Sequence, residues 1–317
     1  MKYTIAIPAY KATFLKECID SILVQTYTDF ELIIVNDASP ENIDEIVSSY
    51  SDNRIRYYKN EKNFGAVDVV DNWNKCLSFA RGEYIMIMGD DDKLMPNYLD
   101  EFNRLIHVYP GLGVYHCRTK EIDENSQFRT ILQNQPEWES VYDLMINRLL
   151  RGRVTFISDF VYNTNLLRQN GGFFKLPLAW ASDDITSYIV AKETGIAHTN
   201  ACVFCYRRHS TSITSSGSVL IKLEAINMEK EWYDIFLSEL LPKKETEAEL
   251  KIILNSSISS VMTKRRALAI GLIGKTKCSF QLFSQLLKNR KELHLSAVTI
   301  IKGLLIAINQ RKNGRSL

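Results

Sequence analysis

The sequence has few of the features that mark secreted, membrane-spanning or disulfide-rich proteins. Its 317 residues include six cysteines, which are scattered through apolar segments. That pattern argues against a disulfide framework and for a reducing compartment. No apolar run reaches the roughly 18 residues of a membrane span, and Met1 and Lys2 lead directly into an apolar segment rather than a secretory signal. We therefore expect a cytoplasmic protein, with peripheral contact with a membrane left open.

Glycine-rich phosphate-binding loops are missing as well. The first apolar run is followed by Pro8, Ala9, Tyr10 and Lys11, without glycine, so a pyrophosphate could not lie against a glycine-rich helix start. The sequence also has no Walker A motif. If phosphates bind, we expect a metal ion rather than backbone amides to neutralise them.

Charge is unevenly distributed along the chain. From Lys251 onward, 13 Lys and Arg stand against one acid, Glu292, whereas the first 250 residues carry 26 basic and 36 acidic residues. The formal charge of +2 therefore conceals an acidic body of −10 and a basic tail of +12. The overall composition, 45% hydrophobic and 24% charged, is that of an ordinary globular protein.

Short apolar runs alternate with segments of helical periodicity over the first 90 residues. The runs that read as strands are Tyr3–Ile7, Phe30–Val35, Arg54–Tyr58 and Tyr84–Met88. Such alternation predicts right-handed crossovers, a mostly parallel sheet and an α/β fold. The loops that follow parallel strands gather at one edge, so we expect Pro8, Asp37 and Asp90 to converge on one crevice.

Three adjacent carboxylates, Asp90, Asp91 and Asp92, follow the last of these strands and Gly89. They repel one another and lose hydration there, which is costly unless a cation compensates them. Mg²⁺ or Mn²⁺, which bind through one or two carboxylates together with substrate phosphates, fit this pattern. The alternative is a solvated acidic turn before the helix that follows Pro96.

Six short motifs occur in order along the first 100 residues. They are Ile7-Pro8-Ala9-Tyr10, Val35-Asn36-Asp37-Ala38-Ser39, Asn60-Glu61-Lys62-Asn63-Phe64-Gly65, Asn72-Trp73-Asn74-Lys75-Cys76-Leu77, Ala80-Arg81-Gly82-Glu83-Tyr84-Ile85, and the aspartates with Pro96. In this order and spacing they resemble the family 2 glycosyltransferases, inverting enzymes of the GT-A fold. The resemblance implies a Rossmann-like, mostly parallel sheet flanked by helices over residues 1–215, followed by a helical, basic region over residues 216–317.

The resemblance also implies a donor site. Asp37 would hold the nucleotide base, and Asp91 and Asp92 would bind Mn²⁺ or Mg²⁺. The full set that we expect to bind the nucleotide-sugar is Pro8, Ala9, Tyr10, Asp37, Asn63, Gly65, Asn74, Asp90, Arg207 and His209. One departure is Gly89, which stands where the family usually has the first aspartate of Asp-x-Asp-Asp; it weakens the ribose contact more than the metal assignment.

The acceptor side is expected in the second half of the chain. Residues 171–184 resemble the family's acidic motif that supplies the catalytic base, with Asp183 as first choice and Asp184 as second. Inverting transfer needs one carboxylate to deprotonate the attacking hydroxyl. An acidic start of a helix expected over Ile185–Thr194 would by itself explain one of the pair. The segment Tyr206–His209 resembles the family's Tyr-Arg-x-His, which closes over the diphosphate; a solvated His209 is the alternative.

The basic tail has helical periodicity and no further site motif. Leu295–Ile308 is apolar but interrupted by Lys302 and Gly303, which is typical of an amphipathic helix on an anionic bilayer. The alternative is a helical bundle that packs on the catalytic domain or forms a homodimer. Basic residues are not interleaved with aromatics, which argues against nucleic acid as a partner.

The resemblance implies a metal-dependent, inverting, hexosyltransferase-type enzyme. Such an enzyme would move a sugar from a nucleotide-diphosphate donor to a hydroxyl of a glycan or lipid-linked acceptor, in surface polysaccharide biosynthesis. The alternative, suggested by Gly89, is a catalytically silent nucleotide-sugar-binding scaffold subunit. A nucleotidyltransferase would need a glycine-rich loop after the first strand, which this chain lacks.

Overall fold

The computed structural model describes residues 1–209, 218–274 and 280–313, and the chain divides into two compact units. One holds the described residues of Met1–Lys175 and Ser182–Ser210, and the other holds those of Leu176–Ala181 and Thr211–Leu317. The boundary expected between residues 215 and 216 lies outside the described residues.

A ten-stranded sheet forms the centre of the first unit. Eight of its strands follow the order β3-β2-β1-β4-β9-β6-β10-β5, while β7 pairs with β6 and β8 pairs with β10. Its strands are β1 (Tyr3–Ala9), β2 (Phe30–Asn36), β3 (Ile55–Lys59), β4 (Tyr84–Ile87), β5 (Lys93–Leu94), β6 (Val114–Ile122), β7 (Phe128–Ile131), β8 (Trp138–Glu139), β9 (Phe160–Asn163) and β10 (Ile196–Arg207). The parallel pairing predicted for β1 to β4 is confirmed. β9 runs antiparallel to both β4 and β6, and β6 and β10 are parallel to each other.

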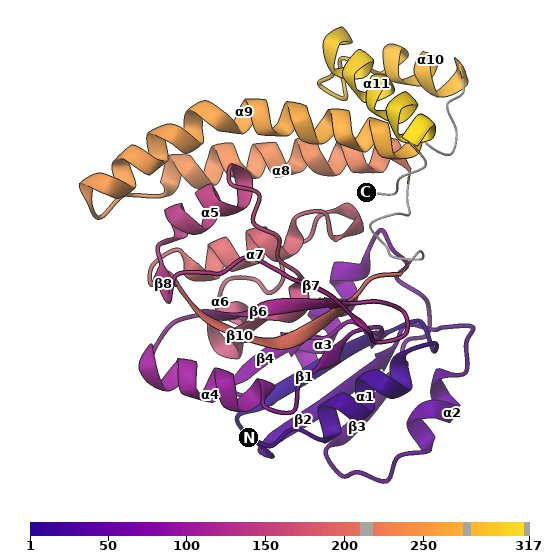
Figure 1. Cartoon of the computed structure of the whole chain (residues 1–317), viewed down its shortest axis with the longest axis vertical. Helices are drawn as coiled ribbons and strands as arrows, with labels where there is room; N and C mark the ends of the chain where they lie inside the picture. Colours follow the sequence, from indigo (N-terminus) through magenta and orange to yellow (C-terminus); the bar gives the residue numbers. More distant parts are fainter. Residues whose placement is uncertain (210–217, 275–279, 314–317) are drawn as a thin grey trace. The chain divides into compact units, whose positions relative to one another are not determined.

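Helices flank this sheet (Figure 1). They are α1 (Leu15–Leu23), α2 (Ile43–Ser48), α3 (Val69–Phe79), α4 (Tyr98–Val108), α5 (Val141–Leu149), α6 (Thr164–Gln169) and α7 (Ser182–Ala191). Ile5 and Ile7 of β1 share one core cluster with Ile19 of α1 and Phe102 of α4. Because side chains alternate along a strand, α1 and α4 cover the same face of the sheet. Because β1, β2 and β4 are parallel, their carboxyl ends lie on the same side of the sheet.

The second unit is helical. Its helices are α8 (Val219–Glu239), α9 (Glu245–Gly274), α10 (Phe280–Lys288) and α11 (Ala297–Asn313). In Figure 1, α8 and α9 run side by side. Glu229 of α8 is fully buried and accepts a hydrogen bond from Trp180 Nε1 at 3.0 Å, while it also pairs with Arg265 of α9. Glu229 therefore links the short segment 176–181 to α8 through the hydrogen bond, and α8 to α9 through the ion pair.

Two glycines bring α11 against α9. A Cβ on Gly303 of α11 would lie 2.6 Å from Cβ of Ile270, and one on Gly271 of α9 would lie 2.5 Å from Cγ2 of Ile306. The helices can approach this closely only because both side chains are absent. The helix predicted over Leu295–Ile308 is confirmed by α11. No helix in the described ranges combines the length and apolarity that crossing a bilayer requires.

Candidate active site

Ala9, at the end of β1, and the two residues after it contact the backbone of Asp37 and the carboxylate of Asp90. The Asp37 amide donates to the Ala9 carbonyl at 2.9 Å. The amides of Tyr10 and Lys11 both donate to Oδ2 of Asp90 at 2.7 Å. The predicted convergence of the β1, β2 and β4 loops is therefore confirmed, because Asp37 and Asp90 are held by the same short stretch of backbone.

Asp37 organises the loop after β3. Its carboxylate is only 5% exposed and accepts hydrogen bonds from Asn60 Nδ2 at 2.8 Å and from the Phe64 amide at 3.1 Å. Asn63 is exposed in this loop, and Gly65 has a φ of 72°, a conformation that favours glycine. The loop motif is thus explained by the backbone path that it must follow around Asp37. Tyr10, by contrast, is 42% exposed at the rim, and Pro8 is half-buried.

The three adjacent aspartates have three different environments. Asp90 binds the backbone amides after β1, whereas Asp92 is buried and accepts a hydrogen bond from the Arg207 amide at 2.8 Å. Burial and the neighbouring Asp91 raise the pKa of Asp90 to about 6 and raise the pKa of Asp92 well above its usual value. Asp91 is half-buried, and its Oδ2 lies 2.7 Å from Nε2 of His209. The direction of both pKa shifts agrees with the lost hydration and the repulsion expected from the sequence.

Asp91 and His209 form the part of the rim that could hold a metal. Within the described residues, no group of three His, Cys, Asp or Glu side chains is arranged to enclose a metal ion. A Mg²⁺ or Mn²⁺ ion shared with substrate phosphates needs only one or two protein carboxylates. Asp91 with His209 fits such a shared site, and Asp92 is the less available ligand because its carboxylate already faces the Arg207 amide.

Asp183 and Asp184 differ in their burial and in their hydrogen-bond partners. Asp184 is buried, and Arg148 Nε binds both of its oxygens, at 2.7 and 2.9 Å, while Thr155 Oγ1 donates to it at 3.1 Å. Asp183 is half-buried, and its Oδ1 accepts the Asp184 amide at 2.9 Å. Burial, together with the charge of Asp184, raises the pKa of Asp183 to about 7. Asp183 is therefore the carboxylate that can exchange a proton near neutral pH.

Both aspartates lie in the first turn of α7. The helix begins at Ser182 rather than at Ile185 as predicted. The helix dipole therefore favours a negative charge on both aspartates.

Comparison with known proteins agrees with this geometry. The sequence profile of Glycosyl transferase family 2 matches residues 4–161. Glycosyltransferase GlyG of Streptococcus pneumoniae serotype 4 is 36% identical over 222 residues, which are 66% of this chain and 72% of GlyG. This chain belongs to glycosyltransferase family 2.

Solved structures support the fold of this family 2 glycosyltransferase. S. aureus TarS 1–349, crystallised in complex with UDP-GlcNAc, aligns with a TM-score of 0.66 at 16% identity, over 99% of this chain and 93% of that one. Mannosyltransferase PcManGT from Pyrobaculum calidifontis, in complex with GDP-Man and Mn²⁺, aligns with a TM-score of 0.57 at 14% identity, over 99% and 88%. The predicted GT-A fold with a helical C-terminal region is confirmed.

Arg207 already has hydrogen-bond partners within the protein. Its guanidinium is fully buried and donates to the Asp91 carbonyl at 2.7 Å, to Ser126 Oγ at 2.9 Å and to Glu17 Oε2 at 2.6 Å, while it lies 4.3 Å from the centre of the Phe14 ring. A phosphate could bind Arg207 only by displacing one of these partners. In this structure the guanidinium of Arg207 contacts the backbone of Asp91, and its contact with the diphosphate stays a prediction.

Glu17 contacts the guanidinium of Arg207 at 2.6 Å, and it was not singled out from the sequence. It lies in the first turn of α1 and also accepts hydrogen bonds from Lys93 Nζ at 2.6 Å and Ser126 Oγ at 2.7 Å. Its acidic character could have been noticed, since an acid there suits the helix dipole. Its three partners come from distant parts of the chain, and no local pattern indicates them.

Asn74 anchors the segment that leads to the aspartate pair. Its side-chain amide donates to the Phe173 carbonyl at 2.9 Å and accepts the Phe173 amide at 2.8 Å. Gly172 has a φ of 84°, and a Cβ on it would collide with Oδ1 of Asn74. Both polar atoms of Asn74 are thus already engaged, and its contact with the donor stays a prediction.

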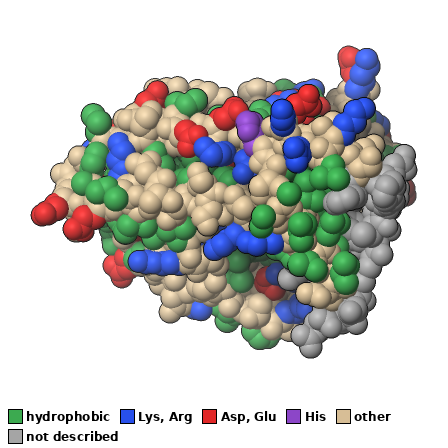
Figure 2. All heavy atoms as spheres, turned by 90° about the horizontal axis from the view of Figure 1, so that it is seen from above, with side chains coloured by type: hydrophobic (Ala, Val, Ile, Leu, Met, Phe, Trp, Pro, Cys, Tyr) green, Lys and Arg blue, Asp and Glu red, His purple; other side chains and the backbone are tan. Residues whose placement is uncertain are grey.

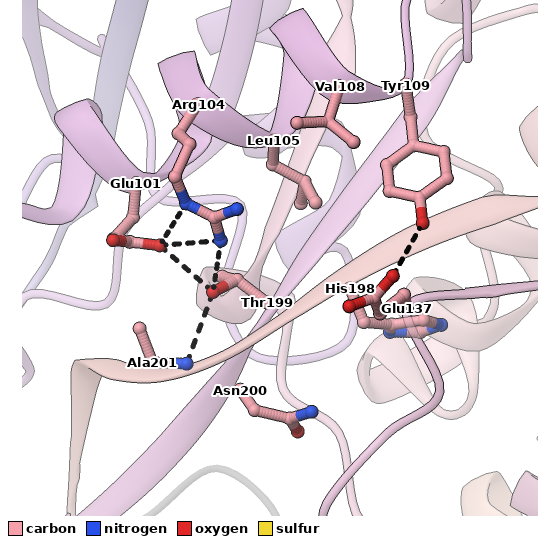
Figure 3. Close-up of a pocket in the computed structure, with 10 residues that line it drawn as sticks. All are labelled: Glu101, Arg104, Leu105, Val108, Tyr109, Glu137, His198, Thr199, Asn200 and Ala201. Atoms are coloured by element: carbon pink, nitrogen blue, oxygen red, sulfur yellow. Dashed lines mark hydrogen bonds and ion pairs between the residues drawn. The ribbon is translucent and has the colours of Figure 1, made fainter.

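A separate cavity of about 390 Å³ lies between α4 and the first half of β10 (Figure 3). Its polar residues bind one another: Arg104 donates to Glu101 at 3.1 Å, and Tyr109 donates to Glu137 at 3.0 Å. It includes Thr199, eight residues before Arg207 on the same strand. The cavity is therefore distinct from the rim at the carboxyl end of the sheet.

Proposed function

We propose that this chain transfers a sugar from a nucleotide-diphosphate sugar to an acceptor hydroxyl, with inversion at the anomeric carbon. The observation that carries the proposal is the shared backbone stretch, Ala9 to Lys11, that binds both Asp37 and Asp90. It brings a carboxylate suited to the nucleotide base next to the acidic triplet. The complexes of TarS with UDP-GlcNAc and of PcManGT with GDP-Man and Mn²⁺ support a donor of this class.

On the donor side, Asp37 holds the base, and Pro8, Ala9 and Tyr10 line the pocket. Asn63, Gly65 and Asn74 complete the set that we assign to the donor, and Asp90 keeps the loop after β1 in place. Asp91, with Asp92 and His209 beside it, would hold Mn²⁺ or Mg²⁺. When bound, the metal supplies Lewis-acid stabilisation of the departing diphosphate.

On the acceptor side, Asp183 is the general base. A carboxylate with a pKa of about 7 accepts a proton far more readily at neutral pH than an ordinary aspartate. As the acceptor oxygen bonds to the anomeric carbon, its proton passes to Asp183, and the bond from that carbon to the diphosphate oxygen breaks with its electron pair. Asp184 remains paired with Arg148, and no covalent enzyme intermediate forms.

The acceptor in this proposal is a glycan or a lipid-linked sugar of a surface polysaccharide, met at the inner face of the cell membrane. This part rests on the family likeness and on the basic helical tail, in which 13 Lys and Arg stand against one acid. A homodimer through the same tail is the competing arrangement.

Donor turnover tests the proposal. The purified chain is incubated with a panel of UDP- and GDP-sugars, with Mn²⁺, Mg²⁺ or EDTA, and both release of nucleoside diphosphate and the thermal shift are measured. We expect one donor to stabilise the protein by mass action and to be turned over only with metal. Asp91→Asn should lose transfer and metal-dependent donor binding, whereas Asp183→Asn should lose transfer and keep binding.

The control is Asp234→Asn, a surface aspartate on α8 paired with Lys230, which should behave as wild type. Donor binding without release under any condition would identify the silent scaffold instead. Wild-type turnover by the Asp91 variant would remove the metal assignment, and retained anomeric configuration in the product, read by NMR, would exclude inversion.

A further inference from the structure

One face of helix α11 packs in the core of the helical unit. Ile300 packs in a cluster with Ile270 of α9 and Leu286 of α10, and Gly303 meets the α9 backbone, where a Cβ would lie 3.0 Å from the Ala267 carbonyl oxygen. Ala307 is fully buried one turn further on. These contacts fix the rotation of α11 about its own axis.

The other face of α11 is apolar and exposed. Val298, Ile301, Leu305 and Ile308 are 59%, 54%, 54% and 43% exposed. Their spacing of three, four and three residues places all four on one side of the helix. A continuous apolar stripe of this kind is unusual on a monomer surface and marks a site of interaction. We call these four residues the α11 stripe.

Basic residues are exposed on α11 and in the segment that precedes it. Lys302 is exposed on the same helix, and Lys288, Arg290 and Lys291 are exposed just before it. Glu292 is the one acid in the sequence from Lys251 onward. Figure 2, seen from above, shows hydrophobic side chains in patches, with both basic and acidic side chains between them.

We propose that the α11 stripe inserts into the surface of an anionic lipid bilayer, with the neighbouring lysines and arginines on the lipid headgroups. An apolar stripe beside basic residues is the composition of a helix that lies in the plane of a membrane interface. A second copy of the chain is the less suitable occupant, because two tails of charge +12 repel each other. The inference goes beyond sugar transfer and does not depend on it.

Vesicle flotation tests this inference with the full chain. The protein is mixed with vesicles of phosphatidylcholine alone or with about 30% phosphatidylglycerol. We expect flotation only with the anionic vesicles and its loss in about 1 M salt. Ile301→Ser with Leu305→Ser should lower the bound fraction at least tenfold, and Lys302→Gln with Lys291→Gln should lower it severalfold.

The matched control is Ile235→Ser with Ile252→Ser, which removes two apolar side chains that are 59% and 68% exposed on α8 and α9. It should float as wild type. Circular dichroism and the thermal midpoint show that each variant is folded, and Leu305→Ser alone replaces the double variant if that one is not. Equal flotation of stripe variant and wild type would overturn the proposal. So would equal binding to both vesicle types, or a stripe variant that changes from dimer to monomer in light scattering.

Discussion

Arg148 Nε lies 2.7 Å from Oδ1 and 2.9 Å from Oδ2 of Asp184, although the two residues are 36 positions apart. This ion pair gives adjacent aspartates different properties. Asp184 is buried against a cation, and Asp183 next to it has a pKa raised to about 7 by burial and by the charge of Asp184. Four predictions follow from this pair and from the acidic triplet.

Transfer should depend on the protonation of Asp183. The general base must be deprotonated, so kcat/KM should rise with pH through about 7 and level off above it. An ordinary aspartate would be fully ionised well below that range. Initial rates at saturating metal between about pH 5 and 9 measure the profile, and Asp183→Glu should move the rising limb. A flat profile would contradict the assignment.

Asp183 should also lower the stability of the fold at high pH. Its folded pKa, about 7, exceeds the ordinary aspartate value of 3.8; the stabilising contribution is therefore complete below about pH 4 and is lost as pH rises through 7. Because Asp183→Asn stays neutral, its free energy of unfolding should exceed that of wild type by about 1–3 kcal/mol at pH 8 and should differ little from it near pH 4. Urea denaturation at the two pH values measures this, with Asp234→Asn as control. A gain of the same size at both pH values would contradict the linkage.

Removal of Arg148 should destabilise the protein strongly. Arg148→Gln leaves Asp184 buried without its cation, which costs about 3–5 kcal/mol. Arg104→Gln is the matched control, because Arg104 forms an exposed pair with Glu101 worth about 1 kcal/mol or less. Denaturant midpoints compare the two variants. If they lose the same stability, the Arg148 pair does not hold the aspartates in place.

Restoring the family's usual aspartate at position 89 should harm the site. A Cβ there would lie 2.8 Å from Oδ2 of Asp92 and 2.9 Å from Oδ1 of Asp91, so both carboxylates would have to move. Gly89→Asp should lose about 1–3 kcal/mol of stability from overpacking and bind the donor more weakly. Gly89→Ala adds the same Cβ without charge, and the difference between the two variants isolates the fourth carboxylate. Tighter donor binding by Gly89→Asp would show that Gly89 is a defect rather than an adaptation.

Local sequence patterns predicted the parts of the fold that depend on local chemistry. The apolar runs at Tyr3 and Phe30 became β1 and β2 with ends displaced by one or two residues. The convergence of Asp37 and Asp90 followed from the topology of parallel strands alone. β9, which runs antiparallel between β4 and β6, could not be foreseen, because its pairing is decided by distant strands.

The individual roles of acidic and basic residues were harder to predict. The sequence could not separate Asp183 from Asp184, since the difference between them is made by Arg148 and Thr155 on other segments. Arg207 was expected at the phosphates because its segment resembles the family's Tyr-Arg-x-His. In the structure, its guanidinium donates hydrogen bonds to Glu17 and Ser126. In both cases long-range partners decide what a charged side chain does.

The buried guanidinium of Arg207 joins segments that are far apart in the chain. Glu17 is 190 positions away from it and Ser126 is 81, yet one side chain fixes both to the backbone of Asp91. A change at Ser126, in the turn between β6 and β7, should therefore alter catalysis through Arg207. Random mutagenesis of this enzyme should find inactivating substitutions at that turn as well as among the aspartates.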